Sequence, residues 1–296
     1  FYSANGLFNR HLYELAADEY QSFLKQFPSH PRADEARFAL GMCFYNMEKL
    51  RQAAEQFQAL AGKENFARSG EVHCLLGQCL LALGDAAAAE KAFAWVTEKQ
   101  PDHDMADDAA AGLAEAALAQ QQWQVAAERY DRFVKRWPKS PLVERALVQM
   151  ALARVRLRQF DGAQKVLEPF AQNYPNSPLA QQAEILLGDC LRESGKPQQA
   201  AEHYDRAAHR LKGNLGAEAL LGLTISLFAA GNFDNAIVAA AELRHSFPNS
   251  SLLRLAELYR ARSLLALKRP ADAERILAEL AKTEAGDEKR EARSGK

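Results

Sequence analysis

The residue types that could do metal chemistry gather at positions 102–108, where the sequence reads DHDMADD. Four aspartates around His103 offer the oxygen and nitrogen ligands that divalent cations take from proteins. The run directly follows Pro101 and opens a helix-forming stretch, where carboxylates stabilise the positive end of the helix dipole. We therefore interpret these residues as a helix start and expect no metal ion or other cofactor to bind there.

A second set of potential ligands consists of His73, Cys74 and Cys79, which fall on one expected helix. Cysteine and histidine bind zinc when several of them converge on one ion. The four cysteines of the chain show no paired metal-ligand spacing, and Cys79 shares a register of small residues with Cys43 and Cys190. We therefore expect the cysteines to be small core residues, and they leave the redox compartment open.

The sequence contains no recognisable enzyme motif. It has no His-Glu-x-x-His, no Gly-x-Ser-x-Gly and no glycine-rich phosphate loop followed by lysine, which predicts a protein that is not an enzyme. The net charge of −1 and the lack of a basic stripe argue against nucleic-acid binding. No apolar run approaches the roughly 18 residues that cross a bilayer, so we expect no membrane span.

The elements that would position any site are helices, and residues 123–141 show their pattern most clearly. Apolar residues recur there at three- and four-residue steps and form one helical face: Val125, Ala126, Tyr130, Phe133, Val134 and Trp137. Pro138 ends this helix because it lacks a backbone donor. Ser140 is then expected to cap a new helix whose first residue is Pro141.

The same pattern recurs eight times, in steps of 36 or 37 residues. Its landmark is an alanine early in the second helix of each repeat: Ala16, Ala53, Ala89, Ala126, Ala163, Ala200, Ala236 and Ala273. Large residues stand four positions later in seven repeats, from Tyr20 in the first to Leu277 in the last, and Ala240 takes this position in the other. Small residues stand twelve and ten positions earlier. Because such spacings keep to one helical face, paired helices should approach closely at the small residues.

We therefore predict an all-α solenoid of about eight helix-turn-helix repeats over residues 1–281. Glycine is expected to end the first helix of three repeats: Gly84, Gly195 and Gly231. Counting back from Ala16, the first helix lacks its opening turn, so we expect further sequence upstream of Phe1. Residues 282–296 are almost wholly polar and are predicted to be a disordered tail.

These registers make the sequence resemble the tetratricopeptide repeat. The likeness is most complete in two stretches: Leu76-Gly77…Ala89…Phe93…Pro101 and Leu187-Gly188…Ala200…Tyr204. The resemblance implies a right-handed superhelix whose first helices line a concave groove. The repeats of this chain are longer than the usual length of about 34 residues.

The extra residues fall in the connections between repeats, which read FPSHP, WPKSP, YPNSP and FPNSS. This style is similar to that of repeat proteins of the bacterial cell envelope, such as outer-membrane-assembly lipoproteins and Tol–Pal-associated periplasmic coordinators. The second resemblance implies a periplasmic or envelope-associated protein. Without it, the expected location is cytoplasmic.

In the geometry of the repeat, groove-facing positions lie 15, 11 and 8 residues before each landmark alanine. From these positions we take ten candidate partner-binding residues: Phe8, Phe38, Met42, Tyr45, Gln78, Glu115, Leu118, Leu152, Asp189 and Arg192. The first of the three registers contains no lysine, so the carboxylate clamp of tetratricopeptide chaperone adaptors is absent. The first four candidates form the expected anchor patch, because aromatic and methionine side chains dominate binding hot spots.

Two interpretations of this apolar groove remain open. Either it packs against itself in a tightly wound superhelix, or it receives an amphipathic helix or an extended apolar segment of a partner. The sequence thus predicts a non-catalytic protein–protein interaction scaffold. Alternatively, the array is the regulatory or substrate-presenting region of a larger enzyme or assembly whose other domains lie outside this chain. Neither the identity of the partner nor the oligomeric state follows from the sequence.

Overall fold

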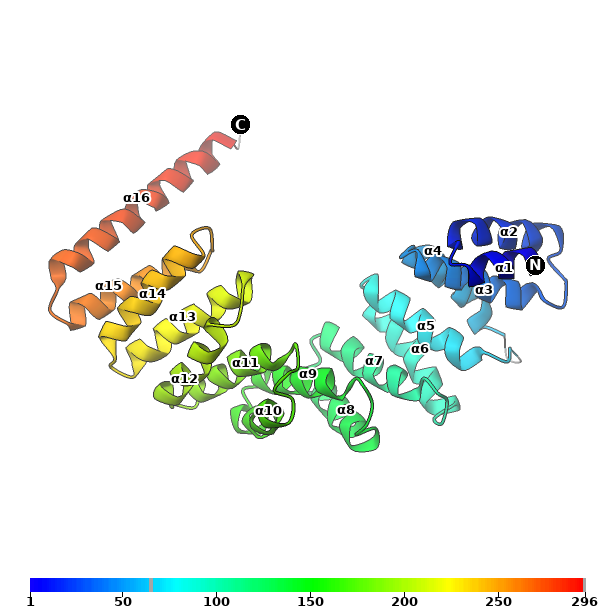
Figure 1. The fold of residues 1–296 in the computed structure, drawn as a ribbon, viewed down its shortest axis with the longest axis horizontal. Coiled ribbons are helices and arrows are strands. Elements are labelled where there is room, and N and C mark those ends of the chain that lie inside the picture. Colours follow the sequence, from blue (N-terminus) through cyan, green and yellow to red (C-terminus); the bar gives the residue numbers. More distant parts are fainter. Residues whose placement is uncertain (64–65, 295–296) are drawn as a thin grey trace. The chain divides into compact units, whose positions relative to one another are not determined.

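The computed structural model describes residues 1–63 and 66–294, with residues 283–294 described by their backbone alone. Sixteen helices follow one another in the described residues, without a strand (Figure 1). They form two compact units, Phe1–Ala153 and Arg154–Lys296, which are described separately below. The predicted fold class, an all-α helical-repeat solenoid, is confirmed.

In the first unit, odd-numbered helices are the first helices of the repeats and even-numbered helices are the second. Consecutive helices pack side by side from α1 through α8. The bounds of the helices are α1 (Tyr2–Asn9), α2 (Tyr13–Gln26), α3 (Ala33–Asn46), α4 (Leu50–Ala61), α5 (Ser69–Ala82), α6 (Ala86–Lys99), α7 (Ala106–Ala119), α8 (Trp123–Arg136) and α9 (Val143–Arg156), whose last residues belong to the second unit.

The second unit continues the same alternation. Its further helices are α10 (Phe160–Asn173), α11 (Ala180–Glu193), α12 (Pro197–Ala208), α13 (Gly213–Ala229), α14 (Phe233–Ser246), α15 (Leu253–Ala266) and α16 (Pro270–Ser294). Consecutive helices again pack side by side, and α13 also contacts both α11 and α15. In the part of the chain that the structure describes, no helix has the length and apolar character that crossing a membrane requires.

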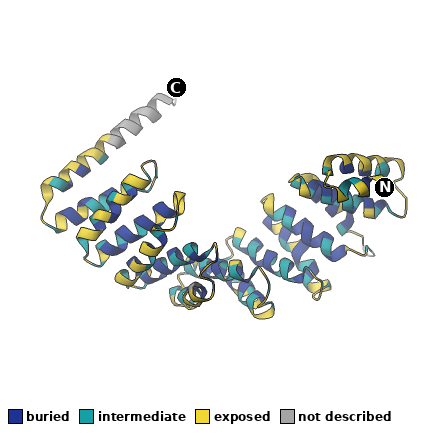
Figure 2. Ribbon diagram, in the orientation of Figure 1, coloured by how far each residue is buried: buried dark blue, intermediate teal, exposed yellow. Residues whose placement is uncertain are grey.

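The landmark alanines lie in the interior of every repeat. All eight are 0 % exposed, which confirms the register predicted from the sequence. The small residues twelve and ten positions earlier are also buried from the second repeat onward. Buried residues line the contacts between helices in both units (Figure 2), so each repeat has its core at the small-residue contact.

Aromatic rings fill the space that glycines leave between helices. The Phe93 ring of α6 contacts both Gly77 of α5 and Gly112 of α7, where an added Cβ would come within 2.7 and 2.5 Å of the ring. Tyr204 of α12 makes the equivalent contacts with glycines of α11 and α13. Each ring therefore belongs at once to its own repeat and to the contact with the next repeat.

The turn inside each repeat contains one residue at positive φ. Glycine occupies this position where the sequence predicts a glycine terminator: Gly84, Gly195 and Gly231, at φ of +86°, +74° and +77°. The other five repeats place a non-glycine residue there, at φ between 57° and 60°: His11, Glu48, Gln121, Arg158 and Lys268. Because the left-handed region costs an L-residue about 1–2 kcal/mol, packing of the two helices must impose the turn in those repeats.

The connections between repeats differ from the prediction where the next helix begins. Helix α9 begins at Val143 and not at Pro141, so the prediction that Ser140 caps a helix starting at Pro141 is wrong. The Ser140 hydroxyl instead accepts a 3.2 Å hydrogen bond from the backbone N–H of Leu142 and closes a turn before the helix. Equivalent residues accept the same bond in four other connections: His30, His103, Ser177 and Ser250.

The last repeat departs from the predicted pattern. Leu277 was expected inside but is 40 % exposed, because no further repeat covers α16 in the described residues. The backbone is helical through Ser294, past residue 281, which was the predicted end of the array. Side chains after Lys282 and residues 295–296 lie outside the described part, and the disorder predicted for residues 282–296 stays a prediction.

Candidate functional site

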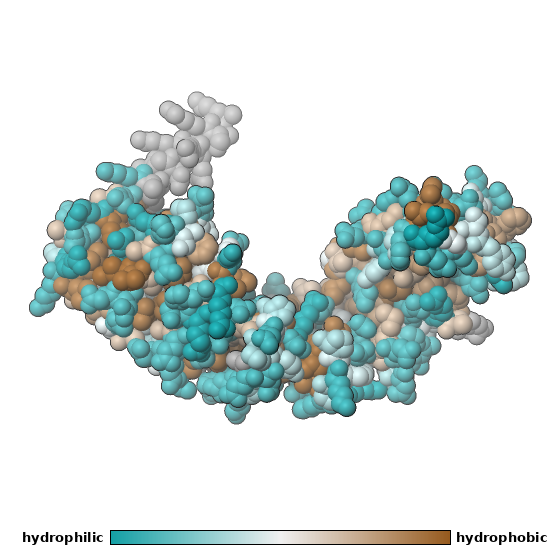
Figure 3. All heavy atoms as spheres, viewed as in Figure 1, coloured by the Kyte–Doolittle hydropathy of each residue, from teal (hydrophilic) through white to brown (hydrophobic). Residues whose placement is uncertain are grey.

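Three of the four residues in the predicted anchor patch line one shallow pocket of the first unit. Phe8 of α1 and Phe38 and Met42 of α3 surround it together with Arg68, and its volume is about 260 Å³. It lies on the surface formed by α1, α3, α5 and α7, which we call the first-helix face. Tyr45, the fourth residue of the patch, stands further along α3 and is not part of this lining. Figure 3 shows apolar patches among hydrophilic residues on the surface of both units.

Phe38 forms the floor of this pocket and is only 3 % exposed. The guanidinium of Arg68 lies 3.9 Å from the centre of the Phe38 ring, and two further rings pack beside it. Arg68 is held there by two hydrogen bonds that it donates to the Glu71 carboxylate, at 2.7 and 2.8 Å. A partner would therefore meet Phe8, Met42 and Arg68 before it reached Phe38.

Tyr45 and Gln78 pair with each other across two first helices. The Tyr45 hydroxyl donates a 3.0 Å hydrogen bond to Gln78 Oε1 and so joins α3 to α5. Burial raises the pKa of Tyr45, and the nearby thiols of Cys79 and Cys74 raise it further, so the hydroxyl keeps its proton. These two candidates thus hold the first-helix face together.

The charged candidates of the second unit also have structural partners. The Tyr204 hydroxyl donates a 2.6 Å hydrogen bond to Asp189 Oδ1, and Arg192 approaches the same oxygen at 3.3 Å. In the first unit Tyr20 donates likewise to Asn5, at 2.5 Å. In both pairs the acceptor stands 15 residues before the tyrosine. The same hydrogen bond therefore joins the first and second helices of these two repeats.

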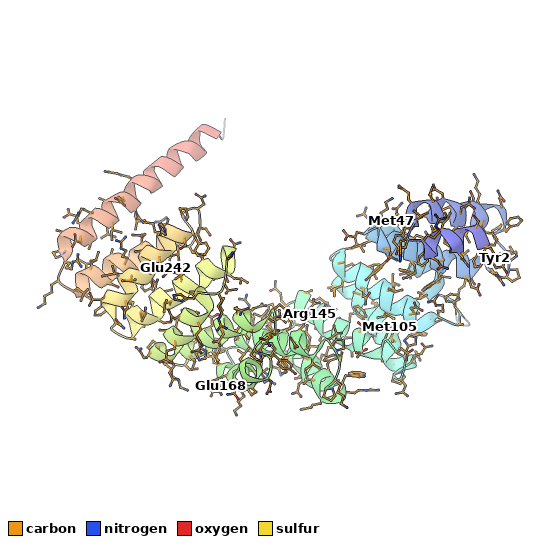
Figure 4. All side chains as sticks on the ribbon, in the orientation of Figure 1. Tyr2, Met47, Met105, Arg145, Glu168 and Glu242 are labelled. Atoms are coloured by element: carbon orange, nitrogen blue, oxygen red, sulfur yellow. The ribbon has the colours of Figure 1, made fainter. Side chains whose placement is uncertain are left out.

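Tyr130 of α8 is the exception to this pattern. Its side chain is 1 % exposed, and its hydroxyl has no hydrogen-bond partner among the described residues. The expected acceptor, Glu115, instead forms an ion pair at 3.1 Å with Arg145 of α9, which is labelled in Figure 4. Burial raises the pKa of Glu115 although Arg145 opposes the shift, and burial followed by the Glu115 charge raises the pKa of Tyr130. The packing of α8 therefore holds a buried donor without an acceptor among the described residues.

The remaining two candidates are aliphatic. Leu118 of α7 and Leu152 of α9 are partly buried in the first unit. The other eight fall into separate groups: the pocket residues Phe8, Phe38 and Met42, the pair Tyr45 and Gln78, the ion-paired Glu115, and the pair Asp189 and Arg192 of the second unit. That these ten residues bind a partner stays a prediction.

The aspartates considered as metal ligands take part in a helix start. Asp107 and Asp108 lie in the first turn of α7, as the interpretation from the sequence requires. Asp107 also accepts a 2.8 Å hydrogen bond from the Ser140 hydroxyl, which ties the start of α7 to the next connection. Among the described residues, no group of three His, Cys, Asp or Glu side chains could hold a metal ion.

The second set of potential ligands is buried in the core of the third repeat. The His73 ring stacks on Trp95 with centroids 3.9 Å apart, and its Nδ1 lies 2.8 Å from the carbonyl oxygen of Ser69. Burial raises the pKa of Cys74 to about 12 and that of Cys79 to about 11. These thiols stay protonated at neutral pH and are therefore poor nucleophiles and poor metal ligands.

Family models of the tetratricopeptide repeat match residues 3–61, 44–104, 148–214 and 194–251, and a further model of the same repeat matches residues 108–140. The chain belongs to the tetratricopeptide repeat family. Tetratricopeptide repeats generally mediate protein–protein interaction, and their fold is typically a non-catalytic scaffold. No curated protein matches the sequence.

Solved structures with tetratricopeptide repeats share the fold at low sequence identity. A tetratricopeptide repeat protein of Parabacteroides merdae is 12 % identical, with 86 % of this chain and 94 % of that chain covered and a TM-score of 0.57. The structure of pilF of Pseudomonas aeruginosa is 15 % identical, with 75 % of this chain and 96 % of that chain covered and a TM-score of 0.57. A signal transduction ATPase of Pyrococcus horikoshii with a tetratricopeptide repeat sensor is 14 % identical, with 94 % of this chain and 47 % of that chain covered and a TM-score of 0.68. At such identities the likeness concerns the fold alone.

Proposed function

We propose that the protein is a non-catalytic scaffold that binds a segment of a partner protein on the first-helix face of its first unit. The pocket of Phe8, Phe38 and Met42 is the observation that carries this proposal. It offers partly buried apolar side chains beside an arginine that is already fixed in place, and binding hot spots combine such groups. The general role of tetratricopeptide repeats in protein–protein interaction supports the same assignment.

The polar groups around the pocket favour an extended partner segment over an amphipathic helix. Asn5 uses Oδ1 to accept the hydrogen bond from Tyr20, so its amide N–H groups are the donors that it can offer to a partner. Asn9 lines the same pocket. The backbone carbonyls of an extended chain need such donors, whereas a helix satisfies most of its own carbonyls. We therefore expect one apolar side chain of an extended segment to enter the pocket.

The test compares wild type with Phe8→Asp and Leu265→Asp. Leu265 occupies the register of Phe8 in the last repeat and is exposed, so its variant controls for the added charge. Each protein is immobilised and used to capture partners from a lysate of the native host, with quantification by mass spectrometry.

We expect Phe8→Asp to lose at least one partner that wild type and Leu265→Asp retain, while all three proteins keep the circular dichroism spectrum of a folded helical array. Equal capture by all three proteins would reject the site. A wild-type protein that binds no partner, while both variants remain folded, would reject the scaffold function itself.

We further propose that the scaffold acts in a bacterial cell envelope. The connections FPSHP, WPKSP, YPNSP and FPNSS support this location through their likeness to those of envelope repeat proteins. The test is fractionation of the native host, followed by detection with an antibody against the protein. Recovery with a periplasmic or membrane marker is expected, and recovery only with a cytoplasmic marker would contradict the proposal.

A further inference from the structure

A second groove of the first unit lies between second helices and is separate from the pocket described above. Helices α6 and α8 form its walls and α7 its floor, and its volume is about 540 Å³. Apolar side chains line much of it: Ala110, Leu113, Phe133 and Trp137. Three arginines on one wall, Arg129, Arg132 and Arg136, and a single glutamate on the other, Glu98, supply its charges.

The three arginines differ in how far their charge is already matched. Arg129 donates to Glu90 at 2.5 Å and to the carbonyl oxygen of Leu113 at 2.8 Å, and the hydrogen bond to Glu90 lowers the pKa of that carboxyl. Arg132 donates only to the backbone of its own helix, at 3.4 Å, and makes no ion pair among the described residues. Arg129 is therefore part of the packing, whereas Arg132 lacks a carboxylate.

Arg136 is held in position at the end of the same wall. Its guanidinium donates to the carbonyl oxygen of Pro101 at 3.0 Å and lies 4.6 Å from the centre of the Trp137 ring. The side chain of Asp102 approaches it only at 3.7 Å, from a fully exposed position. Arg132 and Arg136 are four residues apart on one helix, so their charges lie next to each other with little to neutralise them.

The fold of the repeat does not require this charge. The equivalent groove of the second unit, between α12 and α14, carries Glu242 (Figure 4) in the register of Arg132, and Glu202 and Asp205 line its other wall. The same packing of helices thus accommodates either a positive or a negative side chain at this position. The basic character of the groove between α6 and α8 therefore calls for an explanation other than helix packing.

We infer that the groove between α6 and α8 binds an acidic segment of a partner protein that carries an apolar or aromatic side chain. Carboxylates of the segment would take charge-assisted hydrogen bonds from Arg132 and Arg136. The apolar side chain would cover Trp137 and Leu113, and tryptophan and arginine are the residue types that most often carry binding energy. Arg136 is already ordered, which lowers the entropy lost on binding. This surface is independent of the Phe8 pocket and of the function proposed for it.

The experiment selects peptides from a phage-displayed random library on the immobilised full-length protein, and then measures the affinity of a selected peptide by fluorescence anisotropy. We expect the selected peptides to combine aspartate or glutamate with an apolar residue. Arg132→Glu should weaken their binding by at least about tenfold, and added salt should weaken binding to wild type. Glu98→Gln should strengthen binding, because it removes the one acidic side chain of the groove.

Two controls separate this proposal from the others. Phe8→Asp should leave the affinity of the peptide unchanged, so a failed scaffold function and a failed groove give different results. Selected peptides that are not acidic, or that bind Arg132→Glu as well as wild type, would overturn the inference. A mass that rises with protein concentration and falls in both Arg132→Glu and Glu242→Lys would assign the groove to a second copy of this chain and overturn it as well.

Discussion

The hydroxyl of Tyr204 donates a 2.6 Å hydrogen bond to Asp189, and the corresponding hydroxyl of Tyr130 makes no such bond to Glu115. Asp189 accepts this bond although it also pairs with Arg192 of its own helix, whereas Glu115 pairs with Arg145 of the following helix α9. Two repeats with the same register therefore use the same side chain in different ways. One hydroxyl stabilises its repeat, and the other is buried at a cost.

Removing the two hydroxyls should affect stability differently, with a loss expected only for Tyr204→Phe. Tyr204→Phe loses a hydrogen bond to a charged group and leaves Asp189 with one partner fewer, which should cost about 2 kcal/mol. Tyr130→Phe removes a hydroxyl that has no partner among the described residues, so the free energy of unfolding should stay the same or rise. Urea denaturation followed by circular dichroism measures both. Equal losses in the two variants would contradict the assignment.

A methyl group at Gly112 should destabilise the first unit. An alanine Cβ there would come within 2.5 Å of the Phe93 ring, which Gly77 confines from the other side. We expect Gly112→Ala to cost about 1–3 kcal/mol, in the range of overpacked cores. Gly6→Ala is the matched control, because nothing lies within 4 Å of its added Cβ, and it should stabilise the protein by about 0.4–1 kcal/mol. Thermal melts that shift the same way in both variants would contradict this account.

Glu257 should be the most sensitive charged residue of the second unit. It is 0 % exposed and accepts a 2.8 Å hydrogen bond from Arg244, with Arg260 at 3.3 Å. Glu257→Gln would leave Arg260 without its carboxylate and Arg244 with Glu279, and since both guanidinium groups are partly exposed it should cost about 1–3 kcal/mol. Glu14→Gln serves as control, since Glu14 is exposed and should contribute at most about 1 kcal/mol. Similar denaturation midpoints for the two variants would count against a buried ion network.

The raised pKa of Glu115 predicts a pH dependence with a definite sign. Burial makes the folded state hold this proton more tightly than the unfolded chain does. The stability that Glu115 contributes is therefore complete below its ordinary pKa of 4.5 and is lost as the pH rises through the raised value. The free energy of unfolding of wild type minus that of Glu115→Gln should fall over this window, as measured by urea denaturation at a series of pH values.

Glu90 offers a control of opposite sign for that experiment. Its pKa is lowered, first by the hydrogen bond from Arg129 and then by that from Gln120. The contribution of Glu90 is thus present above the ordinary pKa and is lost as the pH falls through the lowered value. The free energy of unfolding of wild type minus that of Glu90→Gln should therefore rise with pH. A common direction for the two variants would show that the measured dependence comes from other groups.

The repeat could be predicted from the sequence because its marks are periodic. The spacing of the landmark alanines is independent of what surrounds them, and all eight are buried as the register requires. The contact of Phe93 with Gly112 was missed, although a signal existed, since Gly222 stands in the same register and contacts the equivalent ring. A comparison of the positions 14 residues before the landmark would have revealed it.

The candidate site could be predicted only in part, because a register identifies a face and not what covers it. Arg68 covers Phe38 from the connection before α5, and Arg32 lies over Phe1 in the same register, 21 residues before a landmark alanine. Met105 and Leu142 take this position in the next two connections, so the register alone does not tell which side chain covers the ring. The grooves between second helices could not be predicted from the registers, because the residue type at their positions changes between repeats, as from Arg132 to Glu242. The departure at Ser140 has a local cause, because an extra turn precedes α9.

The aromatic rings that contact two neighbouring repeats affect how the protein unfolds. Phe93 contacts both α5 and α7, and Tyr204 contacts both α11 and α13. If one repeat unfolded, the aromatic ring of the preceding repeat would therefore lose its packing contacts on one side. The interfacial free energy between neighbours should then be large relative to what a single repeat contributes alone. Limited proteolysis should accordingly release long fragments of several repeats, and single helix pairs should not accumulate.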